Sequence, residues 1–258
     1  MPPPAATDAA RITPLAGKAA LITGAARRIG AAIAHALHAG GASIVLHYRS
    51  SADEAAALAR NLNDIRPGSA TLARCDLLDG AAVTDLARAA TAAFGGLDIL
   101  VNNASSFYPT PLGDIGEEDW NDLIGTNLKA PLFLAQAAAP ALRERGGLIV
   151  NLADIHGMRP LRGHPVYSVA KAGLIMLTKS LARELGPQVR VNAIAPGPVI
   201  WPEGGVDAQL REEILARTAL KRIGSPEDIG RAVLFFAAEA PFVTGQILAV
   251  DGGRSIGW

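Results

Sequence analysis

The chain has 258 residues, half of them hydrophobic, which is enough for one large core and predicts a single compact domain. Its 24 basic and 24 acidic residues balance, so charge gives no reason to expect nucleic acid or an anionic membrane as a partner. The single cysteine, Cys75, excludes an internal disulfide, and no Cys/His cluster has metal-ligand spacing, so we expect no metal and a reducing, cytoplasmic location.

The N-terminal segment, residues 1–14, is rich in proline and alanine and lacks the basic start and apolar run of a signal peptide. It predicts a loose tail ahead of one domain over residues 15–258. Farther along, His35, His38 and Gly40 interrupt the longest apolar stretch, so no segment is expected to span a membrane.

Past this tail, short β-rich runs alternate with longer alanine-rich helical segments, which is typical of a parallel sheet covered on both faces. Right-handed crossovers between such units predict a doubly wound α/β fold, with its ligand crevice at the carboxyl ends of the strands. The predicted strands are 19–23, 43–48, 69–75, 99–102, 148–152, 190–195 and 247–250. The predicted helices are 29–39, 52–62, 80–94, 118–142, 166–185 and 226–238.

The first predicted strand runs into a glycine turn that carries Gly24 and Gly30 and opens a helix. The N-terminal amides of that helix would form an anion site suited to a dinucleotide pyrophosphate. The alternative is an ordinary strand-to-helix turn, because two glycines alone are a weak signal.

The second predicted strand ends in His47, Tyr48, Arg49 and Ser50, with no carboxylate at its tip. A carboxylate there would bind the ribose hydroxyls of NAD, whereas Arg49 and Ser50 offer a guanidinium and a hydroxyl to a 2′-phosphate. This end therefore favours NADPH, the alternative being that Arg49 is a solvated surface charge. Asp76, after the third strand, would either accept from the adenine amino group or cap a turn.

Tyr167 and Lys171 stand four residues apart in a predicted helix, so they share one face. An ammonium beside a phenol favours the ionised phenol, and we expect Lys171 to lower the pKa of Tyr167 and make it a proton donor. A surface Tyr–Lys pair is the alternative. Two other features favour chemistry: Asn102-Asn103-Ala104 follows a strand, and Asp154 precedes Tyr167 by thirteen residues.

Taken together, the glycine turn, the Asn-Asn-Ala segment and the Tyr-x-x-x-Lys motif resemble the short-chain dehydrogenase/reductase family along nearly the whole chain from about Gly17. The resemblance implies a seven-stranded, mostly parallel Rossmann-like sheet with helices on both faces, NADPH/NADP+ as cofactor, and a homotetramer or dimer. It implies catalytic roles for Asn127, Asp154, Tyr167 and Lys171. The cofactor residues that it implies are Gly24, Arg28, Ile29, Gly30, His47, Tyr48, Arg49, Ser50, Asp76, Leu77, Asn103, Ala104, Tyr167, Lys171, Pro196 and Gly197.

A physical argument also supports Asn127. Pro131, four residues later in a predicted helix, has no N–H to bond the Asn127 carbonyl. The freed carbonyl would hold a water that relays protons to Lys171. The alternative is a proline-kinked helix with no chemical role.

Two departures from the general family pattern narrow the function. Arg28 stands where the family usually has a glycine, and Asp154 where it usually has a serine or threonine. An ionised aspartate accepts from N–H donors or passes a proton, so the cleft suits a ring rich in N–H and C=O groups. This combination, with Ser105 and Phe107 after the Asn-Asn-Ala segment, resembles the pteridine reductases. Phe107 would stack on the pterin, and Arg28, Ser105, Asp154 and Tyr167 would complete the substrate site.

The resemblance therefore implies hydride transfer from NADPH to a C=N carbon of a pterin, with Tyr167 as proton donor. One rival is an NADPH-dependent reductase of ketones or 3-oxoacyl thioesters; another is a non-catalytic NADPH-binding regulatory protein, which should lack Tyr167 or Lys171. The loop over residues 196–221, with Trp201, Pro202 and Glu203, is expected to form a substrate lid or a subunit contact.

Overall fold

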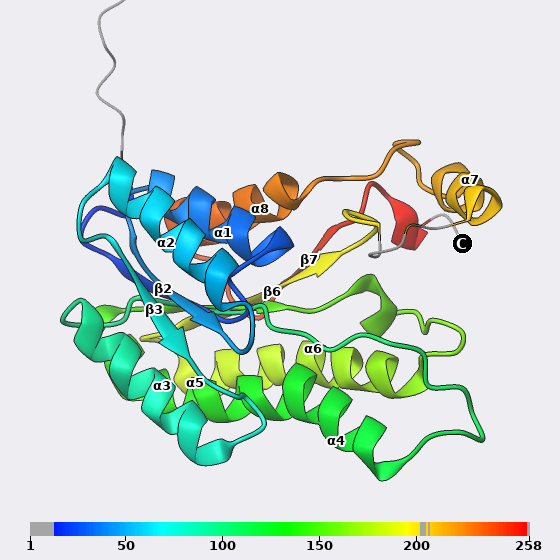
Figure 1. Ribbon diagram of the computed structural model, residues 1–258, viewed down its shortest axis with the longest axis horizontal. Coiled ribbons are helices and arrows are strands. Elements are labelled where there is room, and N and C mark those ends of the chain that lie inside the picture. The colour runs from blue at the N-terminus through cyan, green and yellow to red at the C-terminus, as the bar shows by residue number, and fades with distance from the viewer. Residues whose placement is uncertain (1–12, 202–204, 206, 257–258) are drawn as a thin grey trace, which may run out of the picture.

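A computed structural model describes residues 13–201, 205 and 207–256 of the chain. Its centre is one seven-stranded sheet with the order β3-β2-β1-β4-β5-β6-β7, in which every neighbouring pair is parallel (Figure 1). The order reverses direction between β1 and β4, which places the switch point at the centre of the sheet. The strands are β1 (Ala19–Ile22), β2 (Ser43–Tyr48), β3 (Ala70–Arg74), β4 (Ile99–Asn102), β5 (Leu148–Leu152), β6 (Arg190–Pro196) and β7 (Ile247–Val250).

Helices cover both faces of this sheet, with α1, α2 and α8 on one side and α3 to α6 on the other (Figure 1). Each face has its own buried cluster, one joining β1 and β2 to α1 and α8, the other joining β4 and β5 to α3 and α5. The helices are α1 (Arg28–Ala39), α2 (Ala52–Ile65), α3 (Gly80–Ala93), α4 (Glu117–Ile124), α5 (Ala130–Arg145), α6 (Pro165–Leu185), α7 (Ala208–Ala216) and α8 (Pro226–Ala238). Shorter turns are the π-helix η1 (Gly125–Lys129) and the 3-10 helices η2 (Ile155–Gly157) and η3 (Arg254–Ile256).

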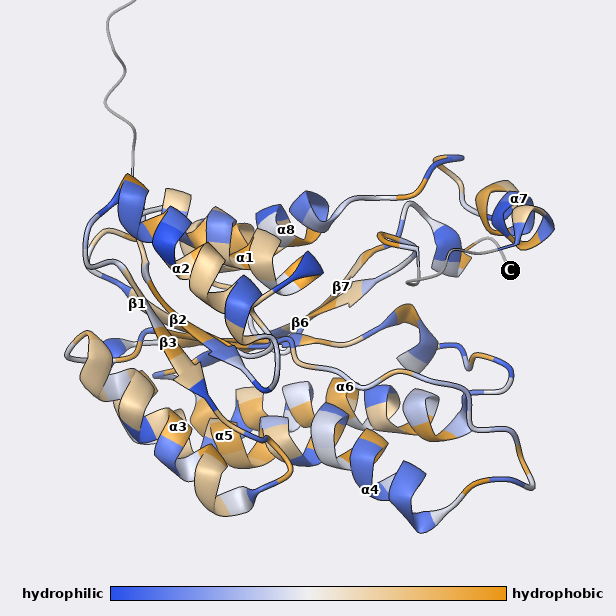
Figure 2. Cartoon of the chain, viewed as in Figure 1, coloured by the Kyte–Doolittle hydropathy of each residue, from blue (hydrophilic) through white to orange (hydrophobic). Residues whose placement is uncertain are grey.

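The hydrophobic pattern explains these layers. Strands β1, β4 and β5 are buried at every position because helices lie on both sides of them. Helix α1 presents Ile33, Ala34 and Leu37 to the sheet, the spacing of one helical face. Figure 2 shows hydrophobic residues along the strands and hydrophilic ones at the start of α4, where Glu117 and Asp119 begin the helix.

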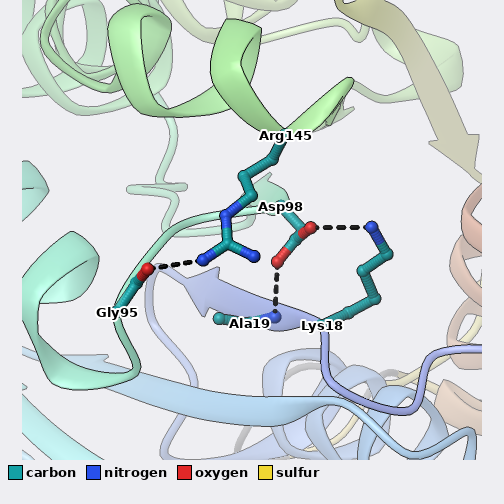
Figure 3. Close-up of polar contacts among 5 residues, drawn as sticks. All are labelled: Lys18, Ala19, Gly95, Asp98 and Arg145. Carbon is teal, nitrogen blue, oxygen red and sulfur yellow. Dashed lines mark hydrogen bonds and ion pairs between the residues drawn. The ribbon is translucent and has the colours of Figure 1, made fainter.

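The amino-terminal ends of the strands are tied by a buried carboxylate (Figure 3). Asp98, just before β4, accepts hydrogen bonds from Lys18 Nζ and from the Ala19 amide, both at 2.9 Å. Nearby, Arg145 at the end of α5 donates to the Gly95 carbonyl. These contacts fix β1 beside β4, the two strands that flank the switch point.

The predicted α/β fold and all seven strands are confirmed. The one-helix prediction over 118–142 is wrong, because the π-helix η1 separates α4 from α5. Helix α7 lies inside the predicted 196–221 loop and was not predicted. Most of the predicted tail, residues 1–12, and Pro202 and Glu203 of the predicted lid lie outside the described residues. Within the described part of the chain, no helix has both the length and the hydrophobicity to cross a membrane.

Candidate active site

A cavity of about 720 Å³ opens at the carboxyl ends of the central strands, where the strand order reverses. Asn127 alone among the predicted site residues does not line it. The predicted residues that do are Gly24, Arg28, Ile29, Gly30, His47, Tyr48, Arg49, Ser50, Asp76, Leu77, Asn103, Ala104, Ser105, Phe107, Asp154, Tyr167, Lys171, Pro196 and Gly197.

The glycine turn after β1 is closed tightly against the end of β4. Gly24 has a φ of +61°, and a Cβ there would stand 3.0 Å from the Ala104 Cα. A Cβ at Gly30 would lie 2.2 Å from the Gly24 carbonyl oxygen, so no side chain fits. Asn103 Nδ2 donates to the carbonyls of Thr23 and Gly24 at 2.8 and 3.0 Å, which holds the turn in place.

Arg28 begins α1 in the left-handed region, with a φ of +54°. This conformation explains why a glycine is the usual residue at this position. Its guanidinium lines the cavity and donates to the Trp201 carbonyl at 3.3 Å. Trp201 in turn lies beneath the Arg211 guanidinium of α7, 5.6 Å from the ring centroid. The glycine turn is thereby linked to the loop that follows β6.

His47 and Asp76 both make structural contacts, of which only the turn capping by Asp76 was predicted from the sequence, as an alternative. The His47 ring is buried; its Nδ1 accepts from the Gly24 amide at 3.1 Å, and its Nε2 lies 3.1 Å from the Cys75 carbonyl. Burial lowers the pKa of His47, which favours the neutral ring that this pair of contacts needs. Asp76 accepts from the Leu78 amide at 3.0 Å, the turn-capping alternative. Arg49 and Ser50 are exposed at the tip of β2.

The centre of the site is a hydrogen bond from the Tyr167 hydroxyl to Asp154 Oδ2, 2.8 Å long. Asp154 Oδ1 accepts from the His156 amide at 2.8 Å, so the carboxylate also caps η2 and cannot rotate freely. Lys171 Nζ donates to the Leu152 carbonyl at 2.8 Å and lies 5.6 Å from the centroid of the Tyr167 ring.

The expectation that Lys171 lowers the pKa of Tyr167 is wrong for this arrangement. Burial raises the pKa of Tyr167 well above its usual value, and the Asp154 carboxylate raises it further. Burial lowers the pKa of Lys171 to about 8, with Asp154 opposing that change. The phenol therefore stays protonated at neutral pH, which is the state required of a proton donor.

Asn127 is placed behind the cavity wall. Its side chain is 1% exposed and accepts from Ser105 Oγ at 2.6 Å. Its Nδ2 donates to the carbonyls of Ser106 and Leu123, each at 2.9 Å. The side chain thus supports the cavity wall, while the predicted role of the Asn127 carbonyl in holding a water stays a prediction.

Phe107 forms the aromatic part of this wall. Its ring meets the Tyr167 ring edge to face at 4.8 Å, with an interplanar angle of 75°. On another side it stacks on the His164 ring at 4.9 Å and 11°. Nothing in the sequence favours His164 as a site residue, because an isolated histidine is more often a structural or surface group.

The donors and shapes of this site fit a dinucleotide. The glycine turn leaves room for close approach to a phosphate, and the Arg28 guanidinium lines the same cavity as Lys171. Residues of β2 and its tip would hold the adenosine half, and Tyr167 and Lys171 the nicotinamide half. Among the described residues, no group of three or more His, Cys, Asp or Glu side chains is placed to hold a metal ion.

Comparisons with known proteins agree with this geometry. Residues 24–255 match the family model described as enoyl-(acyl carrier protein) reductase. Pteridine reductase 1 of Leishmania tarentolae is 38% identical, the match covering 92% of this chain and 96% of the relative. A 3-oxoacyl-(acyl-carrier-protein) reductase of Staphylococcus aureus is 36% identical, with 92% of this chain and 97% of the relative covered.

Two solved structures show the same fold. One is a short-chain dehydrogenase/reductase from Serratia marcescens, with a TM-score of 0.88 and 34% identity over 94% of this chain and 99% of that chain. The other is a blue fluorescent protein from a metagenomic library in complex with NADPH, with a TM-score of 0.88 and 35% identity over 93% of this chain and 98% of that chain.

Proposed function

This chain belongs to the short-chain dehydrogenase/reductase family, and from that membership we propose that it is an NADPH-dependent pteridine reductase. It is an oxidoreductase whose cofactor is NADP(H). The observation that carries the pterin proposal is the pairing of Asp154 with Tyr167 at 2.8 Å. A carboxylate takes the place where a ketone-reducing relative usually has a hydroxyl.

The proposed roles follow from the contacts. When bound, the cofactor supplies a hydride for a C=N carbon of the pterin. Tyr167, kept protonated by its raised pKa, gives its proton to the adjacent ring nitrogen. Asp154 orients that hydroxyl and, after the transfer, relays a proton from a solvent water back to the Tyr167 oxygen. Phe107 forms one wall of the substrate slot, and Arg28 holds negative charge at the cofactor phosphates.

A reductase of 3-oxoacyl thioesters or small ketones is the second candidate, supported by the 36% identity to the Staphylococcus aureus enzyme. The regulatory alternative is weaker, because both Tyr167 and Lys171 are present and buried at the cavity. We also propose a homotetramer, from family membership, and a cytoplasmic location, which the single cysteine supports.

The deciding experiment follows NADPH oxidation with dihydrobiopterin, dihydromonapterin, dihydrofolate, biopterin and acetoacetyl-coenzyme A in parallel. We expect the dihydropterins to give kcat/KM values at least tenfold above that of the thioester. Efficient turnover of the thioester with no turnover of any pterin would replace the first candidate by the second.

A further inference from the structure

The segment from Ser105 to Thr110 has two different sides. Ser105 and Phe107 are exposed, whereas Ser106, Tyr108 and Thr110 are more buried. Ser105, Ser106 and Phe107 line the cavity, and Tyr108 and Thr110 do not. This alternation with a period of two is that of an extended chain, whose successive side chains point in opposite directions. What holds the inner side, the more buried side chains of this segment, therefore sets the position of Ser105 and Phe107 at the cavity.

The inner side is anchored by Asp122 of α4. Ser106 Oγ donates to Asp122 Oδ1 at 3.1 Å, and Thr126 Oγ1 lies 3.5 Å from the same oxygen. The Asp122 carboxylate also interacts electrostatically with the Tyr108 phenol, and burial and this carboxylate together raise the pKa of that phenol. Three hydroxyl groups thus converge on one half-buried carboxylate, which does not itself line the cavity.

The outer side is supported by His164. Its ring stacks on Phe107 at 4.9 Å, nearly parallel, yet His164 is not among the residues that line the cavity. It therefore backs the Phe107 ring from the side away from the substrate slot. Support matters here, because Phe107 is 51% exposed and would otherwise sample several rotamers.

We propose that Asp122 and His164 are positioning residues for substrate: Asp122 fixes the 105–108 segment through Ser106 and Tyr108, and His164 fixes the Phe107 ring. The proposal rests on the proposed function for the identity of the substrate. Neither residue touches the reacting atoms, so their loss should weaken substrate binding more than the chemical step.

The kinetic test compares His164→Ala, His164→Phe and Asp122→Ala with the unmodified protein, using dihydrobiopterin and NADPH. We expect His164→Ala and Asp122→Ala to raise the KM for dihydrobiopterin about threefold to tenfold, the size of one lost aromatic contact, with kcat changed less than twofold. His164→Phe should restore the KM because it restores the stack. NADPH affinity, measured by fluorescence, should stay unchanged in all three.

Matched controls are His35→Ala, at an exposed histidine of α1, and Asp114→Ala, at an exposed aspartate ahead of α4. Both should behave as the unmodified protein. An unchanged KM in both His164→Ala and Asp122→Ala, or a KM that His164→Phe fails to restore, would overturn the proposal.

A measurement without substrate separates this proposal from the proposed function. The imidazole proton resonances of His164, assigned by their loss in His164→Ala, should carry a ring-current shift that disappears in Phe107→Leu. A shift that persists in Phe107→Leu contradicts the stacking support. Failure of the unmodified protein to reduce any pterin contradicts the proposed function alone and leaves this spectroscopic result to judge His164.

Discussion

At the scale of single residues, the surroundings of Tyr167 and Lys171 in the fold determine their protonation states. Tyr167 and Lys171 lie at the cavity as their spacing predicts, and Asp154 joins them. Their pKa values depend on burial and on Asp154, and the spacing of two residues in a helix predicts neither of these effects. The same holds for His164 and for the Asn127 side chain, whose partners come from distant parts of the chain.

The lowered pKa of Lys171 leads to a prediction on pH. Its ammonium is charged below about 8 and loses its proton as the pH rises through that value, so activity should fall there. In Asp154→Asn the falling limb should move to lower pH, because the carboxylate that raises the Lys171 pKa is gone. Initial rates between pH 6 and 10 measure this, and a flat profile across that range would contradict it. Tyr167→Phe, which we expect to be inactive yet able to bind NADPH, is the control for cofactor affinity.

Replacing Asp154 tests the pterin assignment at the same place. Asp154 accepts from both Tyr167 and the His156 amide through separate oxygens, whereas a serine has one. We therefore expect Asp154→Ser to lower kcat/KM for the pterin by roughly ten- to a thousandfold. Phe107→Ala serves for comparison, since it should chiefly raise KM. Full pterin activity in Asp154→Ser would favour the carbonyl reductase candidate.

Arg28 combines backbone strain with charge, and two variants separate them. Arg28→Gly removes both, whereas Arg28→Ala removes the guanidinium but keeps a Cβ at a φ of +54°. Arg28→Gly should therefore be more stable than Arg28→Ala by about 1 kcal/mol. Both should weaken NADPH binding to the same extent, since both lose the cation. Urea unfolding and cofactor titration measure the two effects, and equal stability of the variants would contradict the strain argument.

At the scale of elements, the central strands β1, β4 and β5 were predictable because helices bury them on both sides, which requires short apolar runs. The end of α4 could not be predicted, because the π-helix η1 adds one residue to the helical turn without interrupting the helical pattern of the sequence. Helix α7 was missed for another reason: it has no buried residue and thus no apolar face to detect. The glycine turn was predictable because a turn with a positive φ and no room for a side chain favours glycine.

The tip of β2 is the element on which cofactor choice depends. Arg49 is exposed there and lines the cavity with Ser50. Arg49→Asp exchanges a phosphate partner for a like charge, so the preference for NADPH over NADH should fall on the order of a hundredfold. Arg60→Asp, at an exposed position of α2 outside the cavity lining, is the matched control. The dissociation constants of NADPH and NADH measure this preference. An unchanged ratio of the two constants in Arg49→Asp would show that Arg49 does not bind the cofactor.

For the whole molecule, the sequence predicted one sheet, two helical layers and a crevice at the switch point, because each follows from the alternation of strands and helices. Assembly follows less directly. Both α5 and α6 expose apolar side chains, among them Phe133 at 42% and Met176 at 61%. Val169, which is 53% exposed, stands seven residues before Met176, so the two side chains lie on one face of α6.

These apolar positions give the proposed homotetramer its test. Burial of such side chains between subunits would stabilise an assembly of four 26.6 kDa chains, which light scattering after gel filtration should detect. Val169→Glu and Met176→Glu together should yield smaller species, because each would bury an unpaired charge at a contact. Ile65→Glu, at a position of α2 that is 65% exposed, should leave the mass unchanged. A single-chain mass for the unmodified protein at micromolar concentration would rule out the tetramer, and a tetramer that persists in the double variant would place the contact elsewhere on the surface.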